Sequence, residues 1–468
     1  MVKFRDEWRD LAGWSSYNLP LNTSSNSAAK LYDATLDQML YYYNHPQLGG
    51  VGETLQRMLA EDPDFVAGNM LRHSFEMFVS NNDRARKRFD MYVRSLDDGK
   101  LNEWEKGHIR GAEFLYKEDL IGAMDHYSAL CTKYPHDLHS FNLAYVLGLV
   151  TGHSEYMRDV PRSIVGHYKP HMPHYGLIHG KQCFGHAEMG EYKEAMQCGL
   201  TALEAFPLDS WAVHAMAHTY ENQSQPKQGI EFLGRTTKNW SRGINFRQHI
   251  DWHHANAYIQ LGEYETGLTI YDEHIAQCAV SGDVFPMSDA SSFLMRLRID
   301  GQSTGNREEK LGKLWSEQTN EFTSLFYDGH CALAAAMSND TASLDVLRDN
   351  MSEYIANDRS GWNKIVTSSY GIQLVDGMRA MCDGDFAGAA RQLQSCVPEM
   401  VRKIHGSKAQ KSVFTLTYVD CAVKSRDRGL MCAAQQHLQD MYVWNKVDIL
   451  PPIQQRLWDK IELELSKQ

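Results

Sequence analysis

The sequence lacks the features that mark secreted and membrane proteins. Its nine cysteines are odd in number and no two form a C-x-x-C pair, so neither a disulfide framework nor a cysteine-based metal site is indicated. The opening residues MVKFRDEWRD carry charges where a signal peptide has an apolar stretch, and the longest apolar window, Leu143–Val150, is far too short to cross a bilayer. We therefore expect reduced cysteines and a cytoplasmic protein without a membrane partner.

Concentrated positive charge is absent as well. The chain has 47 Lys and Arg residues against 59 Asp and Glu, which gives a net charge of −12, and the basic residues are spread among the acidic ones. Binding to a nucleic-acid backbone requires clustered positive charge, so we expect no nucleic acid among the partners.

Proline and runs of β-branched residues are scarce, which favours helix over sheet. Only 13 of the 468 residues are proline, whereas 43% are hydrophobic and 23% charged, as in ordered proteins with a sizeable core. No segment rich in Gly, Pro or Ser divides the chain, and we predict a single domain over residues 1–468. Residues 1–27 are expected to be an irregular leader before a helix near Ala28, with Asn26 or Ser27 as its N-cap.

One later stretch also interrupts the helical pattern. Residues 159–175 are rich in proline and histidine, and Pro161, Pro170 and Pro173 argue against a continuous helix there. We predict a long connection within the solenoid. Long connections often cover the concave face of a repeat protein, so residues 159–186 are expected to form a solvated lid, although whether this lid closes over the groove stays open.

A helical-hairpin pattern recurs along the chain. Gly-x-aromatic, followed three residues later by a small residue, appears at 190–195, 262–267 and 384–389, and a looser copy begins at Gly111. This is the pattern of tetratricopeptide hairpins, in which small residues let paired helices approach. We predict an all-α solenoid of degenerate tetratricopeptide-like hairpins curved around a concave groove.

Two histidine pairs recur at the period of such hairpins. His214 and His218 are four residues apart, and His249 and His253 repeat that spacing 35 positions later. Residues four apart share one face of a helix, and equivalent helices of neighbouring repeats stack side by side. We expect both pairs to face one space. Measured between the hairpin anchors, the second hairpin begins about one turn late, which would place His253 beside His214. Either register keeps the imidazoles within about two turns, and the choice between them stays open.

Tryptophans and a carboxylate accompany these histidines: Trp211 and Glu221 lie on the stripe of the first pair, and Trp252 on that of the second. In one interpretation, His214, His218 and His253 bind a divalent transition metal such as zinc, with Glu221 as a ligand or general base. In a second, one histidine is a metal-free general base oriented by Glu221. In a third, these side chains only hydrogen-bond neighbouring helices to each other.

The candidate catalytic set is listed here in full: His214, His218, Glu221, His249 and His253. The candidate substrate-binding residues are Trp211 and Trp252, together with Asp328 and His330 from a later unit. Asp272 and His274 are expected to face neighbouring helices or solvent. Ser407 is interpreted as a helix cap rather than a nucleophile.

Several segments carry a resemblance to a known family. They are Asn18–Asn26, Lys30–Leu36, Leu48-Gly49-Gly50, Asp62-Pro63-x-Phe65, Gly262–Glu265, Leu268–Asp272 and Gly406-Ser407-x-Ala409-Gln410. In this order, and over essentially the whole chain, the sequence resembles the tetratricopeptide repeat protein 38 family. The family pattern also matches every candidate residue of the histidine-bearing helices, but not His254. The resemblance implies a helical solenoid and implies no reaction.

Three functions remain open from the sequence. A His/Glu/Trp-lined concave pocket favours binding of a small polar ligand, and a metal-dependent or histidine-based hydrolase or lyase is the first alternative. The second is a scaffold that binds a peptide in its groove, although such grooves usually present rows of Asn, Lys or Arg. No G-x-S-x-G, P-loop, dinucleotide or kinase motif is present, and the sequence leaves enzyme activity and oligomeric state open.

Overall fold

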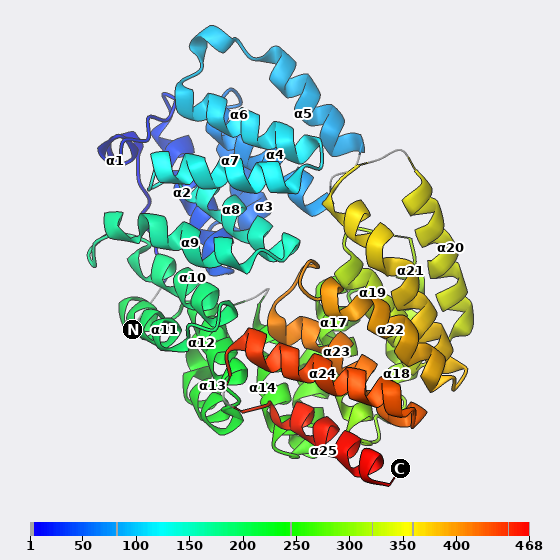
Figure 1. The fold of residues 1–468 in the computed structure, drawn as a ribbon. Coiled ribbons are helices and arrows are strands. Elements are labelled where there is room, and N and C mark those ends of the chain that lie inside the picture. Colours follow the sequence, from blue (N-terminus) through cyan, green and yellow to red (C-terminus); the bar gives the residue numbers. More distant parts are fainter. Residues whose placement is uncertain are drawn as a thin grey trace.

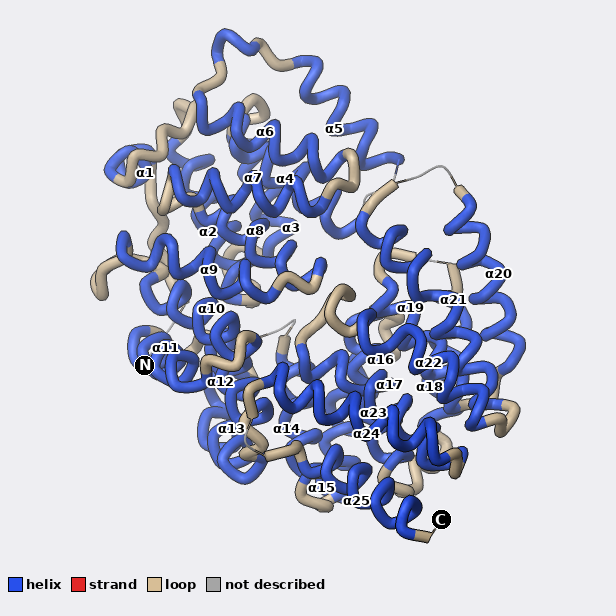
Figure 2. Tube along the Cα trace, viewed as in Figure 1, coloured by secondary structure: helices blue, strands red, loops and turns tan. Residues whose placement is uncertain are grey.

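The computed structural model of the protein describes residues 4–80, 83–243, 246–320, 322–357, 360–447 and 449–467. Within these ranges every regular element is helical and no strand occurs (Figure 2), as predicted. The first elements are α1 Leu11–Ser16, α2 Asn26–Tyr41, α3 Val51–Glu61, α4 Val66–Ser80, α5 Asp83–Ser95, η1 Asp98–Lys100, α6 Glu103–Tyr116, α7 Leu120–Lys133, α8 Leu138–Thr151, α9 Ser154–Ile164 and η2 Val165–His167.

The middle of the chain continues this series without a break in the pattern. Its elements are α10 Tyr175–Glu188, α11 Tyr192–Ala205, α12 Ser210–Asn222, α13 Pro226–Trp240, α14 Arg247–Gln260, α15 Tyr264–Ile270, the π-helical turn η3 Tyr271–Ile275, α16 Ala276–Ala279 and α17 Val284–Ile299. The last elements are α18 Arg307–Trp315, η4 Ser316–Gln318, α19 Leu325–Met337, α20 Thr341–Ala356, α21 Trp362–Cys382, α22 Phe386–Met400, α23 Lys408–Ser425, α24 Arg428–Asn445 and α25 Pro452–Ser466.

The predicted hairpin turns are confirmed by backbone geometry. Gly190, Gly262 and Gly384 end their helices with φ of +69°, +81° and +74°, in the left-handed region that favours glycine. Consecutive helices then pack in pairs, and every second helix packs on the equivalent helix of the next hairpin, from α10 through α12, α14, α17 and α19 to α21. The chain is therefore an all-α solenoid of helical hairpins.

The C-terminal helices fold back onto the middle of the solenoid. In Figure 1, α23 to α25, in orange and red, lie beside α12 to α14, in green, and α23 packs on both α12 and α17. Tyr192 Oη donates to the carbonyl of Asn445 at 2.6 Å, and Arg456 forms an ion pair with Asp300. The inner helices next to α12 are thus covered by the protein's own chain.

The predicted leader is not wholly irregular, and the predicted cap is one residue late. Residues 11–16 form α1, and α2 begins at Asn26 because the hydroxyl of Ser25 accepts a hydrogen bond from the backbone N–H of Ala28. Asn26 instead accepts a hydrogen bond from the backbone N–H of Leu11, which ties α1 to α2.

The predicted connection over 159–175 is also shorter than expected. Helix α9 runs through Pro161, whose missing N–H leaves the carbonyl of Met157 without its helical partner. That carbonyl faces Gly185 of α10, where an added Cβ would lie only 2.2 Å from it. The irregular part is confined to residues 168–174.

The expected solvated lid over 159–186 is wrong. Residues 175–186 belong to α10, a buried helix of the inner row. His174, at its N-terminus, is buried and binds Asp37 at 2.9 Å and Arg5 at 3.1 Å, so it anchors the N-terminal segment. In the part of the chain that the structure describes, no helix is both long and apolar enough to cross a membrane.

Candidate functional site

Four histidines meet between two helices of the inner row. His214 and His218 come from α12, and His249 and His253 come from α14. All four are buried, and one ring nitrogen of each lies within 4.8 Å of those of the others. We call these four residues the histidine cluster. The sequence prediction that both pairs face one space is confirmed.

The structure decides the register of the two helices, which the sequence left open, and shows no one-turn offset. The ring centre of His253 lies 4.3 Å from that of His218 and 5.2 Å from that of His214, and the ring of His249 lies 5.0 Å from His214. The two pairs therefore lie nearly level, as the 35-residue repeat alone would place them. This level arrangement brings all four rings together rather than three.

A carboxylate lies against the outer nitrogen of three of the four rings. Nδ1 of His253 contacts Glu221 at 2.7 Å, and Nδ1 of His249 contacts Asp289 of α17 at 2.8 Å. Nδ1 of His218 lies 3.5 Å from Glu188 of α10, a longer contact.

A hydrogen bond from Nδ1–H to a carboxylate fixes the ring tautomer and leaves Nε2 with a lone pair. The Nε2 atoms on the inner side of the cluster then have unusual surroundings. Nε2 of His218 and Nε2 of His214 are 2.8 Å apart, and Nε2 of His253 is buried without a hydrogen-bond partner among the described residues. This distance is that of a hydrogen bond in which one ring donates Nε2–H and the other accepts, and a bound cation would take the place of that proton. Inward lone pairs backed by outward carboxylates are the arrangement of histidine metal ligands.

Burial controls the charge of the cluster. Burial, followed by the charges of the neighbouring rings, holds the pKa of His214 and His253 well below the usual value of 6.5. Burial also raises the pKa of Glu221 and Asp289. At Glu188 burial acts in the same sense, but His218 and Lys408 outweigh it and lower the pKa to about 2. The rings of His214 and His253 are therefore neutral at pH 7, as metal binding requires.

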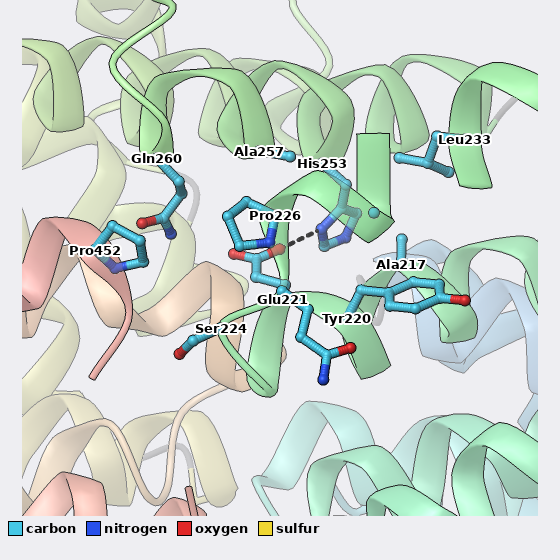
Figure 3. A pocket seen from close by; sticks show the side chains of 12 residues that line it. Ala217, Tyr220, Glu221, Ser224, Pro226, Leu233, His253, Ala257, Gln260 and Pro452 are labelled. Carbon is cyan, nitrogen blue, oxygen red and sulfur yellow. Dashed lines mark hydrogen bonds and ion pairs between the residues drawn. The ribbon is translucent and has the colours of Figure 1, made fainter. Parts of the chain in front are cut away.

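A small cavity borders the cluster on the side of Glu221 and His253. It has a volume of about 20 Å³, enough for about one water molecule. Figure 3 shows Glu221 and His253 joined by their hydrogen bond, with Gln260 and Pro452 at another side of the cavity. Glu221 thus contacts both a cluster histidine and the space where a water or a reacting group can lie.

The two predicted tryptophans are packed in the core around the cluster and do not line this cavity. Trp252 is fully buried and stacks on His249 with the ring planes 9° apart. Trp211 lies 5.0 Å from His214 and carries the ammonium of Lys181 at 3.6 Å from its ring centre. Their positions next to the imidazoles were predicted correctly, and both tryptophans pack directly against cluster histidines.

The second-tier candidates lie outside the histidine cluster. Asp328 and His330 are buried on α19, where Nδ1 of His330 bonds the carbonyl of Phe326 at 2.7 Å. Asp272, in η3, forms a two-pronged ion pair with Arg307, and His274 is half-buried beside it.

Sequence reasoning missed the residues that approach the cluster from distant segments. Helix α23 begins beside it: the backbone N–H of Lys408 donates to Glu188 at 2.8 Å. Ser407 caps α23 through a capping box with Gln410, as its interpretation as a cap predicted. Arg296 of α17 is buried near Glu221 and Asp289, and its guanidinium bonds the carbonyl of Ala409. None of these residues belongs to the repeat that revealed the histidines, so spacing alone held no signal for them.

Comparison with known families adds no assignment to this geometry. No family model matches the chain.

Proposed function

We propose that the protein binds one divalent transition metal ion, such as zinc, at the histidine cluster and uses it to catalyse hydrolysis or proton transfer on a small polar molecule. The observation that carries this proposal is the set of outer carboxylates. Glu221 and Asp289 bond Nδ1 of His253 and His249, and Glu188 lies 3.5 Å from Nδ1 of His218, an arrangement that favours Nε2 as the ligand atom.

The chemistry of the donor set suits such an ion. Neutral imidazoles bind zinc and its first-row neighbours at about 2.0–2.1 Å. Ligand atoms within 4.8 Å of one another need only small ring movements to meet one ion. Bound metal would polarise a substrate oxygen or lower the pKa of a bound water.

Glu221 is the residue that we assign as the general base. It is the one outer carboxylate that lines the cavity next to the cluster, and about a fifth of its side chain is exposed. Burial raises its pKa toward the range in which a carboxylate accepts a proton efficiently. A water in the adjoining cavity would lie between this base and the cluster.

A peptide-binding scaffold is less well supported by the same geometry. The cluster is covered by α23 and by its own helices, so an extended peptide lying along the inner row would not reach it. We also propose, from the sequence resemblance, that the chain is a member of the tetratricopeptide repeat protein 38 family. A cytoplasmic location agrees with its nine free cysteines.

Elemental analysis of tag-free protein, purified without chelator, tests the metal proposal. We expect one transition metal per chain in the wild type and a loss of at least nine-tenths of it in His214→Ala and in His253→Ala. His254→Ala is the matched control, because His254 neighbours His253 but packs against Tyr258 instead of the cluster. Metal-free wild-type protein that also takes up no zinc or cobalt on titration would contradict the proposal.

A further inference from the structure

A second cavity lies where the N-terminal segment, α2 and the start of α10 meet. Its volume is about 160 Å³, and it shares no lining residue with the cavity beside Glu221. Its walls come from Arg5, from α2, from residues 170–176 and from the end of α11. Cavities of about 150 Å³ hold a six-membered ring molecule such as benzene. The fold thus leaves room for a small ligand at a place separate from the histidine cluster.

A buried imidazole with a carboxylate behind it lines this second cavity. His174 exposes 4% of its surface, and its Nε2 lies 2.9 Å from Oδ1 of Asp37, whose other oxygen accepts from the hydroxyl of Tyr43 at 2.8 Å. Burial lowers the pKa of His174, so the ring is neutral at pH 7. Since a carboxylate only accepts, Nε2–H donates to Asp37 and the lone pair lies on Nδ1. Nδ1 forms no hydrogen bond with the described residues, which leaves it as an acceptor for a ligand.

The hydroxyl of Tyr41 is a second polar group that a ligand can use. Tyr41 lies one turn after Asp37 on α2 and lines the cavity, and its ring centre is 6.2 Å from that of His174. Within the described parts of the chain its hydroxyl has no hydrogen-bond partner. Burial raises the pKa of Tyr41 well above the usual value of 10, so the hydroxyl keeps its proton. The cavity therefore offers one acceptor and one group that both donates and accepts.

The charged side chains that line the second cavity neutralise each other. Nη1 of Arg5 lies 3.2 Å from Asp37 and 3.1 Å from Nε2 of His174, and Nη2 pairs with Asp33 behind them at 2.7 Å. A carboxylate ligand would meet Asp37 and the lone pair of His174. An ammonium ligand would meet the guanidinium of Arg5. Like charges placed side by side are unfavourable, so the cavity favours a neutral ligand.

The remaining wall of the cavity is apolar. Pro170, Met172, Pro173 and Phe206 line it, and the ring of Phe206 packs edge-on against Tyr41 with the ring centres 5.0 Å apart. Sites for small molecules combine mostly apolar walls with a few placed polar groups. A ring with hydroxyl groups suits both parts, because its carbon face packs on the prolines while its hydroxyls donate and accept hydrogen bonds.

We propose that the second cavity binds a small neutral ring that carries hydroxyl groups, such as a monosaccharide or a cyclic polyol. One hydroxyl donates to Nδ1 of His174, another forms a hydrogen bond with Tyr41, and the carbon face lies against Pro170 and Pro173. This site is additional to the histidine cluster. It does not depend on a metal there, because neither Glu221 nor any cluster histidine lines the second cavity.

Saturation-transfer NMR titrations of the full chain with D-glucose and, separately, with myo-inositol test the inference. The variant is Tyr41→Phe, which removes only the hydroxyl. Tyr92→Phe is the matched control, because its hydroxyl is also buried without a partner among the described residues but lies on α5, outside the cavity. We expect at least one probe to bind the wild type and the control equally, and to bind Tyr41→Phe about 3- to 10-fold more weakly, as the loss of one hydrogen bond requires. The two probes show which hydroxylated ring the cavity prefers.

Charged probes and thermal unfolding on the same samples separate the outcomes. Acetate and methylammonium should bind more weakly than the better ring probe, and tighter binding of either would overturn the inference. Tyr41→Phe should melt at the wild-type temperature, because its hydroxyl has no partner in the described fold. A clearly lower melting temperature would assign that hydroxyl to the fold and would also overturn the inference. The same holds for wild-type protein that binds neither ring probe, and for equal affinity in Tyr41→Phe and wild type.

Discussion

Replacing Asp289 by asparagine tests the support that we assign to the outer carboxylates. Asp289 is 1% exposed, and its Oδ2 lies 2.8 Å from Nδ1 of His249. Asparagine has nearly the same shape, so packing in α17 is retained while the charge of the acceptor is lost. A hydrogen bond to a charged acceptor contributes about 1.5–3 kcal/mol, and a neutral one about 0.5–1.5 kcal/mol. The difference of about 1–1.5 kcal/mol corresponds to roughly a tenfold weaker metal Kd.

The three outer carboxylates lie at different distances from their histidines, and these distances rank the expected losses of metal affinity. The contacts of Asp289 and Glu221 are 2.8 and 2.7 Å, whereas that of Glu188 is 3.5 Å. We therefore expect Asp289→Asn and Glu221→Gln to weaken metal binding about tenfold, and Glu188→Gln to weaken it less. Competition for zinc with a chromogenic chelator measures all three affinities, with circular dichroism to confirm folding. Unchanged affinity in folded Asp289→Asn would refute the assignment of His249 as a supported ligand.

Three further predictions concern stability. Gly185→Ala would place a Cβ 2.2 Å from the carbonyl of Met157 and force α9 from α10, so chemical denaturation should show a loss of about 1–3 kcal/mol in the free energy of unfolding. Gly234→Ala in α13, where the space around the glycine is open, should instead stabilise the protein by about 0.5–1 kcal/mol, and equal effects of the two variants would contradict the packing of α9 on α10. Burial lowers the pKa of His330 to about 3, so between pH 6.5 and 3 the unfolded chain binds a proton that the folded chain does not. The stability that neutral His330 contributes is therefore full above pH 6.5 and is about 1.4 kcal/mol smaller at pH 5.5 than at pH 7.5. His330→Ala should show a correspondingly shallower pH dependence of its free energy of unfolding. Zinc at a hundred times its Kd should raise the unfolding free energy by about 2.7 kcal/mol, and a chelator should reverse this in thermal unfolding; identical melting curves would count against a metal in the folded state.

The parts of the fold that follow from local pattern were predictable from the sequence. The positive-φ glycines at 190, 262 and 384 marked hairpin turns, because few other residues adopt that backbone conformation. The 35-residue offset of the histidine pairs placed four rings together, since stacked hairpins repeat their positions. Pro161 misled the prediction of a connection, because tolerance of a proline within α9 depends on Gly185 of another helix. Such a compensation cannot be read from the local segment.

The charged surroundings of the cluster were not predictable for a related reason. Asp289 of α17 bonds His249, and the backbone N–H of Lys408 in α23 bonds Glu188, although α17 and α23 belong to other hairpins than α14. Their approach depends on how the solenoid closes, and closure results from packing over the whole chain. The sequence therefore identified the four histidines and Glu221, whereas Asp289, Glu188 and Arg296 needed the structure.

The closure of the solenoid bears on the choice between scaffold and enzyme. A scaffold exposes the inner helices of its hairpins, whereas here α23 packs on α12 and α17 and buries that face. The enclosed region nevertheless contains polar groups that the described residues leave unsatisfied, including Nε2 of His253 and Nδ1 of His214. Each such group destabilises the folded state by about 1–3 kcal/mol or more. Apolar residues would serve stability better in these places, so the arrangement favours a site that a metal ion completes.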